Sequence, residues 1–174
     1  MRNFNRKGFT LVELLVYVAL FAIVVTLAIQ FTLGIVNASA RSNAKEEVAI
    51  GASSILQAFD ALARGAQAVY DPTSNFIGDP GQLSLVTSNT PPPNEKTSYI
   101  DMYLDGGRFC VKREVSGVAC VSSMKVEVTS LIFRKMTQAG GAESVQARFT
   151  IRFRTQSPKY YATQTFQTSA RLRL

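Results

Sequence analysis

The chain begins with a long apolar run near its N-terminus. Between residues 9 and 36 the only charged residue is Glu13. About 20 apolar residues are enough for a helix to cross the hydrocarbon core of a membrane. The run therefore predicts a transmembrane helix that is apolar on all sides. A cleaved secretory signal with its cutting site in residues 37–44 is the competing interpretation.

A helical pattern with one apolar face continues after this run, which argues against a cleaved signal. The apolar residues recur at alternating spacings of four and three, the period of an amphipathic helix. They are Val48, Ala52, Ile55, Phe59, Leu62, Ala66 and Val69. Asp71-Pro72 then supplies a stop signal. We expect one helix from about residue 9 to about residue 70, with a second half that needs a domain to cover its apolar face.

The remainder of the chain, residues 71–174, has the pattern of antiparallel strands. Residues 71–96 are rich in Pro, Gly, Ser, Thr and Asn, and predict a loop with one short strand at 82–87. Beyond Ser98 apolar and polar residues alternate, which is typical of half-buried strands. The expected strands are 98–104, 108–115, 118–123, 124–136, 144–154 and 160–174. The prediction is an α+β fold in which the second half of the helix packs on an antiparallel β-sheet.

Charge and cysteine content add a topology to this fold. The net charge is +7, and Arg2, Arg6 and Lys7 all precede the apolar run. Basic residues are retained on the cytoplasmic side, so the C-terminal domain is expected outside the cytoplasm. Cys110 and Cys120 lie on neighbouring predicted strands, and the chain has no His to complete a zinc site. A disulfide between these two cysteines is therefore the default expectation for an extracytoplasmic domain.

Residues 6–15, RKGFTLVELL, resemble the prepilin-type signal of type IV pilins and type II secretion pseudopilins. The match consists of a basic leader, the pair Gly8-Phe9, Glu13 at the fifth position after the glycine, and a long apolar helix. The resemblance implies a pilin fold, cleavage between Gly8 and Phe9 by the prepilin peptidase, and N-methylation of Phe9. It divides the chain into a cleaved cytoplasmic leader (1–8), a transmembrane or filament-core helix (9–36), an amphipathic second half of the helix (37–70) and an extracytoplasmic β-sheet head domain (71–174).

The same resemblance suggests a reason for the carboxylate of Glu13. An ionised side chain in hydrocarbon costs at least a few kcal/mol. After cleavage Phe9 would carry a positive amine, and two buried charges of opposite sign cost less together than apart. In the family the equivalent Glu neutralises the terminal amine of a neighbouring subunit, which implies an assembly charge pair between Glu13 and Phe9. The alternative is a Glu tolerated at the membrane interface of an ordinary signal anchor.

A second segment resembles a subgroup of this family. Residues 103–110, YLDGGRFC, followed by residues 126–135, VEVTSLIFRK, are similar to W-type minor pilins and J-type minor pseudopilins. The implied partners are the prepilin peptidase, other major and minor pilins, a membrane assembly platform with its ATPase, and membrane lipid before assembly. The implied location is a single pass in the cytoplasmic membrane and then an extracellular or periplasmic filament. A major pilin, or an anchored binding domain that never polymerises, remains as an alternative.

The sequence gives no sign of catalysis, a cofactor or a metal. Without His there is no Ser-His-Asp or Cys-His pair, and no phosphate-binding glycine motif is present. Asp101 and Asp105 are read as turn and edge residues rather than Ca²⁺ ligands. Clustered positive charge on the last two strands is a candidate for DNA contact, although such residues often only keep a strand face soluble, which is the interpretation we favour. These residues are Arg148, Arg152, Arg154, Arg171 and Arg173.

Overall fold

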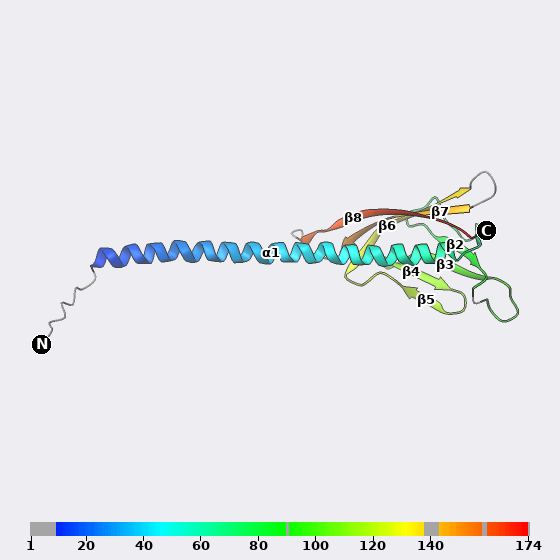
Figure 1. The fold of residues 1–174 in the computed structure, drawn as a ribbon, viewed down its shortest axis with the longest axis horizontal. Coiled ribbons are helices and arrows are strands. Elements are labelled where there is room, and N and C mark those ends of the chain that lie inside the picture. The colour runs from blue at the N-terminus through cyan, green and yellow to red at the C-terminus, as the bar shows by residue number, and fades with distance from the viewer. Residues whose placement is uncertain (1–9, 90, 138–142, 158–159, 174) are drawn as a thin grey trace. The chain divides into compact units, whose positions relative to one another are not determined.

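One long helix runs through the N-terminal third of the chain. The computed structural model describes residues 10–89, 91–137, 143–157 and 160–173. The chain divides into two compact units, Met1–Ala40 and Arg41–Leu174. Helix α1 (Leu11–Arg64) begins in the first unit and ends in the second, without a break at Gly34 (Figure 1). The prediction of a long helix followed by antiparallel strands is confirmed.

The first half of α1 exposes its apolar side chains in all directions. Every residue of the helix from 11 to 39 is exposed. The hydroxyls of Thr26 and Thr32 donate to the carbonyl oxygens four residues earlier, each at 2.8 Å. These donors are therefore satisfied without water, as a bilayer requires. Among the described residues, α1 is the one helix long and apolar enough to cross a membrane, judged by length and composition.

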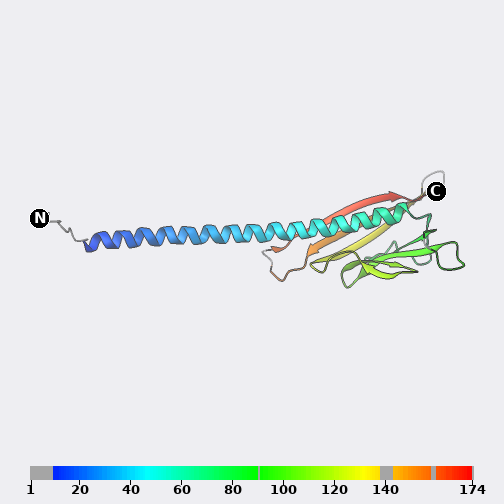
Figure 2. The same ribbon diagram turned by 60° about the horizontal axis from the view of Figure 1, so that its bottom comes forward.

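The strands of the second unit form two antiparallel sheets (Figures 1 and 2). The five-stranded sheet has the order β1-β2-β3-β4-β5, and the three-stranded sheet the order β6-β7-β8. The strands are β1 (Ala68–Val69), β2 (Leu83–Thr87), β3 (Ser98–Asp105), β4 (Arg108–Arg113), β5 (Gly117–Cys120), β6 (Val126–Thr137), β7 (Glu143–Phe153) and β8 (Thr163–Arg171). The single predicted sheet is thus two sheets, because alternation along a strand does not specify which strand it pairs with.

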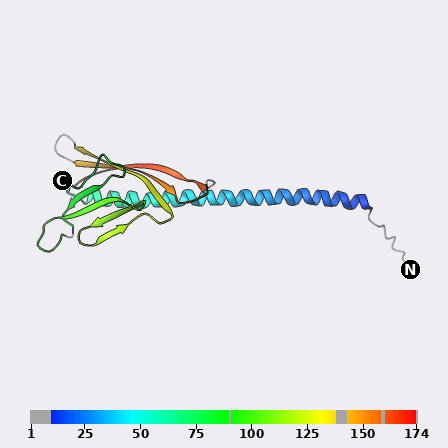
Figure 3. The same ribbon diagram turned by 180° about the vertical axis from the view of Figure 1, so that it is seen from behind.

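The apolar face in the second half of α1 belongs to the hydrophobic core of this unit. Figure 3 shows the ribbon of the helix and the sheets from behind. Gly51 lets the helix approach the three-stranded sheet closely. A Cβ at this position would lie 3.0 Å from Cγ2 of Val126 and 3.1 Å from Cδ1 of Ile151. About two helical turns after Gly51, the ring of Phe59 stacks on that of Phe133, with the ring centroids 6.3 Å apart. The stripe seen in the sequence is therefore the contact between helix and sheets.

The end of α1 differs from the prediction, because the helix stops at Arg64 rather than near residue 70. Gly65 follows at once, and glycine is among the least favourable helix residues. The backbone N–H of Tyr70 donates to the carbonyl oxygen of Ser84 at 2.8 Å, within the β1–β2 pairing. Val69 is buried through this strand and not through the helix. Sheet pairing has thus replaced the last predicted helical turn.

Hydrogen bonds from the β3–β4 hairpin and from the loop before β2 fasten the sheets to each other. The β3–β4 hairpin turns through Gly106 and Gly107, whose φ angles of 56° and 74° fit a two-residue type I′ turn. The carbonyl oxygen of Gly107 accepts the N–H of Val128 in β6 at 2.8 Å. In the loop before β2, the carboxylate of Asp79 accepts the hydroxyl of Ser130 at 2.6 Å, next to a register shift in β6. The head unit is therefore held together across the seam between its sheets.

The last described residues return to the C-terminal end of α1. The N–H of Leu172 donates to the carbonyl oxygen of Glu143 at 3.0 Å, and the N–H of Arg173 donates to that of Ala66 at 2.9 Å. The side chain of Leu172 is buried in the core. The predicted C-terminal strand is thus confirmed as β8, and the backbone beyond it is tied to the residues just after the helix.

Candidate functional site

Glu13 occupies the first turn of α1, where it forms a reciprocal cap with Thr10. The hydroxyl oxygen of Thr10 accepts the N–H of Glu13 at 3.3 Å. In return, Oε2 of Glu13 accepts the backbone N–H of Thr10 at 3.2 Å and its hydroxyl at 3.1 Å. This arrangement is a capping box. The Thr-x-x-Glu spacing that encodes it was readable in the sequence, and it gives Glu13 a local role that the sequence reasoning missed.

The cap leaves part of this carboxylate available. It uses Oε2, and in the part of the chain that the structure describes no hydrogen bond reaches Oε1. A carboxylate can accept about four hydrogen bonds, so one further donor can be accommodated. The residue is exposed in the isolated chain. The same side chain can therefore cap its own helix and face a cation from outside.

Gly8 and Phe9, the residues predicted for cleavage and methylation, lie outside the described residues. The structure therefore bears on only one partner, Glu13, of the expected charge pair. Both processing steps and the pairing with the Phe9 amine stay predictions.

The two cysteines are joined by a disulfide, as expected. Cys110 and Cys120 lie directly opposite each other in the register of β4 and β5. Cys110 is fully buried, whereas Cys120 is half-buried at the edge of the sheet. The bond fastens the short edge strand β5 to the rest of the five-stranded sheet, so its role is structural.

Two of the five arginines proposed for DNA contact are engaged within the head. Arg152 forms an ion pair with Glu127, with 2.8 Å between Nη2 and Oε2. Its hydrogen bond to that carboxylate, and the carboxylate charge, raise the pKa of Arg152 above its already high ordinary value. Nη2 of Arg154 donates to the carbonyl oxygen of Gly106 at 3.4 Å. The positive charge of Arg152 is thus locally balanced.

The other three arginines do not form a compact cluster. Arg148 lies opposite Gln167 and Arg171 lies opposite Ser144 in the β7–β8 register, four positions apart along β7. At about 3.3 Å per residue this separates the two by roughly 13 Å. Arg173 lies beyond the end of β8. The three are exposed, but the arrangement resembles a soluble strand face more than a phosphate-binding patch.

An ion cluster at the junction of β1, β6 and β7 was not expected from the sequence. Nζ of Lys135 lies 2.9 Å from Oδ2 of Asp71 and 2.9 Å from Oε1 of Glu143. The other oxygen of Glu143 accepts the backbone N–H of Val69 at 3.1 Å. These residues are far apart in the sequence, so no local sequence pattern predicts that they form a cluster. The cluster fastens the short strand β1 to the three-stranded sheet.

The cluster shifts the pKa values of its members in opposite directions. Hydrogen bonds to Asp71 and Glu143 raise the pKa of Lys135. Burial by itself would raise the pKa of Glu143, but the hydrogen bonds from Lys135 and Val69 outweigh it, and this pKa is lowered. Both charged forms are therefore favoured by folding.

Chemistry-bearing side chains elsewhere in the head serve local structure. Asp101 accepts the hydroxyl of Ser84 at 2.6 Å, and Asp105 ends β3 at the hairpin. Within the described ranges, no three His, Cys, Asp or Glu side chains gather closely enough to hold a metal ion. The N-terminal segment is thus the candidate site with a specific signal.

Comparison with known protein families also points to the N-terminal segment. Residues 3–29 match the prokaryotic N-terminal methylation motif. No curated protein and no solved structure matches the chain. The matched segment covers the basic leader, the capped start of α1 and its exposed apolar turns. The methylation motif, joined to one long helix and antiparallel sheets, supports the assignment of this chain to the type IV pilin and pseudopilin family.

Proposed function

We propose that the chain is a minor pilin or minor pseudopilin that belongs to the initiation complex or the tip complex of a type IV pilus-like filament. The observation that carries this proposal is the position of the methylation motif at the start of a helix whose first half is exposed and apolar and whose second half is buried in a head. Such a helix needs lipid before assembly and other apolar helices afterwards. The chain then acts by assembly, as a structural subunit rather than an enzyme.

Processing supplies the group that makes assembly specific. The prepilin peptidase removes residues 1–8 by cutting between Gly8 and Phe9, and Phe9 becomes the methylated N-terminus. The basic leader holds the N-terminus in the cytoplasm. The head, residues 71–174, then lies outside the cytoplasmic membrane, where a disulfide between Cys110 and Cys120 can persist.

Glu13 recruits the chain by pairing with the Phe9 amine of a neighbouring subunit. The available Oε1 supports this role, because accepting the amine does not require the capping contacts on Oε2 to break. Both charges leave water on assembly, and the pair removes much of the desolvation cost. The assembly platform and its ATPase lift the paired subunit from the membrane.

The minor-subunit role is supported by the structural position of the segment that resembles W-type and J-type subunits. Residues 103–110 form the β3–β4 hairpin, and residues 126–135 lie in β6. The N–H of Val128 joins them by donating to Gly107. The two parts of the resemblance are thus one structural unit in the head. A major pilin, or an anchored binding domain that does not polymerise, is the alternative.

Intact-mass analysis of the membrane form, followed by co-purification with partner pilins, tests the proposal. We expect loss of residues 1–8, one added methyl group, and recovery in small amounts relative to the partners. Loss of about 40 residues would indicate a secretory signal and end the pilin assignment. Recovery as the most abundant subunit would indicate a major pilin. A processed chain that associates with no pilin would indicate an anchored domain.

A further inference from the structure

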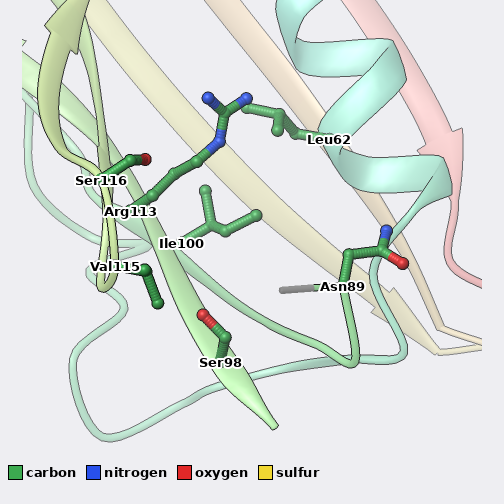
Figure 4. Close-up of a pocket in the computed structure, with 7 residues that line it drawn as sticks. All are labelled: Leu62, Asn89, Ser98, Ile100, Arg113, Val115 and Ser116. Carbon is green, nitrogen blue, oxygen red and sulfur yellow. The ribbon is translucent and has the colours of Figure 1, made fainter. Parts of the chain in front are cut away.

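A cavity of about 440 Å³ opens in the head between the C-terminal end of α1 and the five-stranded sheet. Its volume lies in the range of small-ligand pockets, roughly 300 to 1,000 Å³. The lining residues come from α1, the loop after β2, strands β3 and β4, and the turn after β4 (Figure 4). They are Leu62, Asn89, Ser98, Ile100, Arg113, Val115 and Ser116.

Arg113 brings a positive charge to this cavity that the described part of the head does not balance. It lies opposite Ile100 in the β3–β4 register, so both side chains are on the sheet face turned toward α1. Figure 4 shows its guanidinium reaching across the cavity toward Leu62. Among the described residues, no hydrogen bond or ion pair is formed by this guanidinium, in contrast to Arg64 and Arg152.

The nearest carboxylates along the strands are engaged elsewhere. Glu114 is on the opposite strand face and accepts the backbone N–H of Tyr99 at 3.1 Å. Asp101 accepts the hydroxyl of Ser84 at 2.6 Å. The guanidinium therefore has its full set of donors available for an anion that enters the cavity.

The other walls indicate what kind of anion fits. Leu62, Ile100 and Val115 give the cavity an aliphatic lining. The hydroxyls of Ser98 and Ser116 add neutral hydrogen-bonding groups at its sides (Figure 4). One planar guanidinium matches a carboxylate through two parallel hydrogen bonds. A doubly charged phosphate would find one cation and a largely apolar surround, so a carboxylate on an aliphatic body is the better match.

We propose that this cavity binds an aliphatic carboxylate, with Arg113 holding the carboxylate and Leu62, Ile100 and Val115 covering the apolar part. Two sources share this chemistry, a free short-chain acid and the C-terminal residue of a peptide. The site would add a ligand-binding activity to the head, independent of how the N-terminal helix assembles.

Ligand-observed NMR on the full chain in lipid nanodiscs tests this proposal, with empty nanodiscs as the blank. The probes are N-acetyl-leucine, its neutral counterpart N-acetyl-leucinamide, hexanoate and inorganic phosphate. We expect the carboxylate probes to bind at least tenfold more tightly than the amide and the phosphate. Stronger binding of N-acetyl-leucine indicates a peptide end as the source, and stronger binding of hexanoate indicates a free acid.

Two variants on adjacent positions of β4 assign the site. Arg113→Gln keeps length and hydrogen-bonding capacity but removes the charge, and should weaken carboxylate binding at least tenfold. Lys112→Gln removes the same charge from the opposite face of the strand and should leave binding unchanged. Thermal unfolding should be the same for both variants. The proposal is overturned when neither carboxylate binds, when phosphate binds as well as the carboxylates, or when the two variants weaken binding equally.

Discussion

Glu13 has an observed role and an expected role at the first turn of α1. Its Oε2 caps the helix through Thr10, and its negative charge is the expected partner of a neighbour's Phe9 amine. Capping by itself does not require a charge, because Gln serves at the same position of a capping box. A carboxylate in the first turn is also favoured by the positive end of the helix dipole, so pairing of Glu13 with an intersubunit cation stays a prediction.

Substitutions of Glu13 separate the effect of losing the helix cap from the effect of losing the charge. Glu13→Leu loses the return half of the cap, at a cost of about 1 kcal/mol. It also leaves the neighbour's amine unpaired in an apolar surround, at roughly 3–5 kcal/mol. We expect normal expression and cleavage but loss of co-purification with partner pilins at matched membrane abundance. Glu13→Gln keeps the cap and should be less severe.

Thr10→Val is the matched control for this experiment. It removes the hydroxyl half of the cap and keeps the carboxylate of Glu13. Recruitment should survive in this variant, because the charge pair remains. Undiminished recovery of Glu13→Leu with its partners would refute the pairing role.

Because of the Lys135 cluster, we predict that the free energy of unfolding falls at both low and high pH. Because folding lowers the pKa of Glu143, its contribution is present above the unfolded pKa and is lost as pH falls through the folded value. Because folding raises the pKa of Lys135, its contribution is present below the unfolded pKa and is lost as pH rises through the folded value. Thermal unfolding followed by circular dichroism should show a plateau near neutral pH with both flanks declining.

The substitution Glu143→Gln should lower the plateau by about 1 kcal/mol and flatten the acid flank, because the titrating partner of Lys135 is gone. Asp60→Asn is the control, since Asp60 forms an exposed pair with Arg64 on the surface of α1. Exposed pairs contribute little, so this variant should keep the parent profile. An unchanged acid flank in Glu143→Gln would contradict the assignment.

Among the elements, α1 depends on close contact with the three-stranded sheet at Gly51. Gly51→Val would place its branched side chain against Val126 and Ile151, where even a Cβ is tightly confined. Overpacking of this kind costs about 1–3 kcal/mol. Denaturant unfolding of the head should show this loss. Ala49→Val puts the same side chain on the exposed face of the helix and should cost only its helix propensity. Equal losses in both variants would show that packing at Gly51 is unimportant.

The β4–β5 edge depends on its disulfide. Replacing Cys110 and Cys120 together by Ala should lower the free energy of unfolding by about 2–3 kcal/mol, because the unfolded chain gains freedom. Thiol titration of denatured, unreduced parent protein should find the two cysteines unreactive. Two free thiols in protein taken from the outer side of the membrane would contradict the bond.

The element boundaries show how far sequence patterns reach in this chain. The helical stripe and the strand alternation predicted α1 and the strands, because burial on one face leaves a period in the sequence. The same stripe misplaced the helix end, since Ala66 and Val69 keep the helical spacing and are buried but lie beyond the end of α1, with Val69 in the β1–β2 pairing. The division into two sheets and the ion cluster around Lys135 depend on contacts between distant segments, which no local pattern records.

For the whole molecule, we predict that processing between Gly8 and Phe9 is required for entry into a filament. Gly8→Leu should block the cut, because the peptidase accepts a small residue at this place in the family that the chain resembles. The uncleaved chain should stay in the membrane fraction with a full-length intact mass and should not enter filaments. Gly8→Ala is the matched control, since it keeps a small residue at the cut and should be processed normally. Normal incorporation of the Gly8→Leu variant would refute the processing scheme.

The return of the chain to the end of α1 has a practical consequence for labelling. The N–H of Arg173 donates to the carbonyl oxygen of Ala66, so the last described residue lies just beyond the C-terminal end of α1. A fluorescent or affinity tag fused to the C-terminus would therefore be attached close to that end of the helix, which is far along the chain from the apolar turns. A fusion there adds bulk without altering the exposed apolar first half of α1. Shortening the chain is a different operation, because removal of Leu172 takes a buried side chain out of the core. Extension is thus the safe modification of this terminus, and trimming is the damaging one.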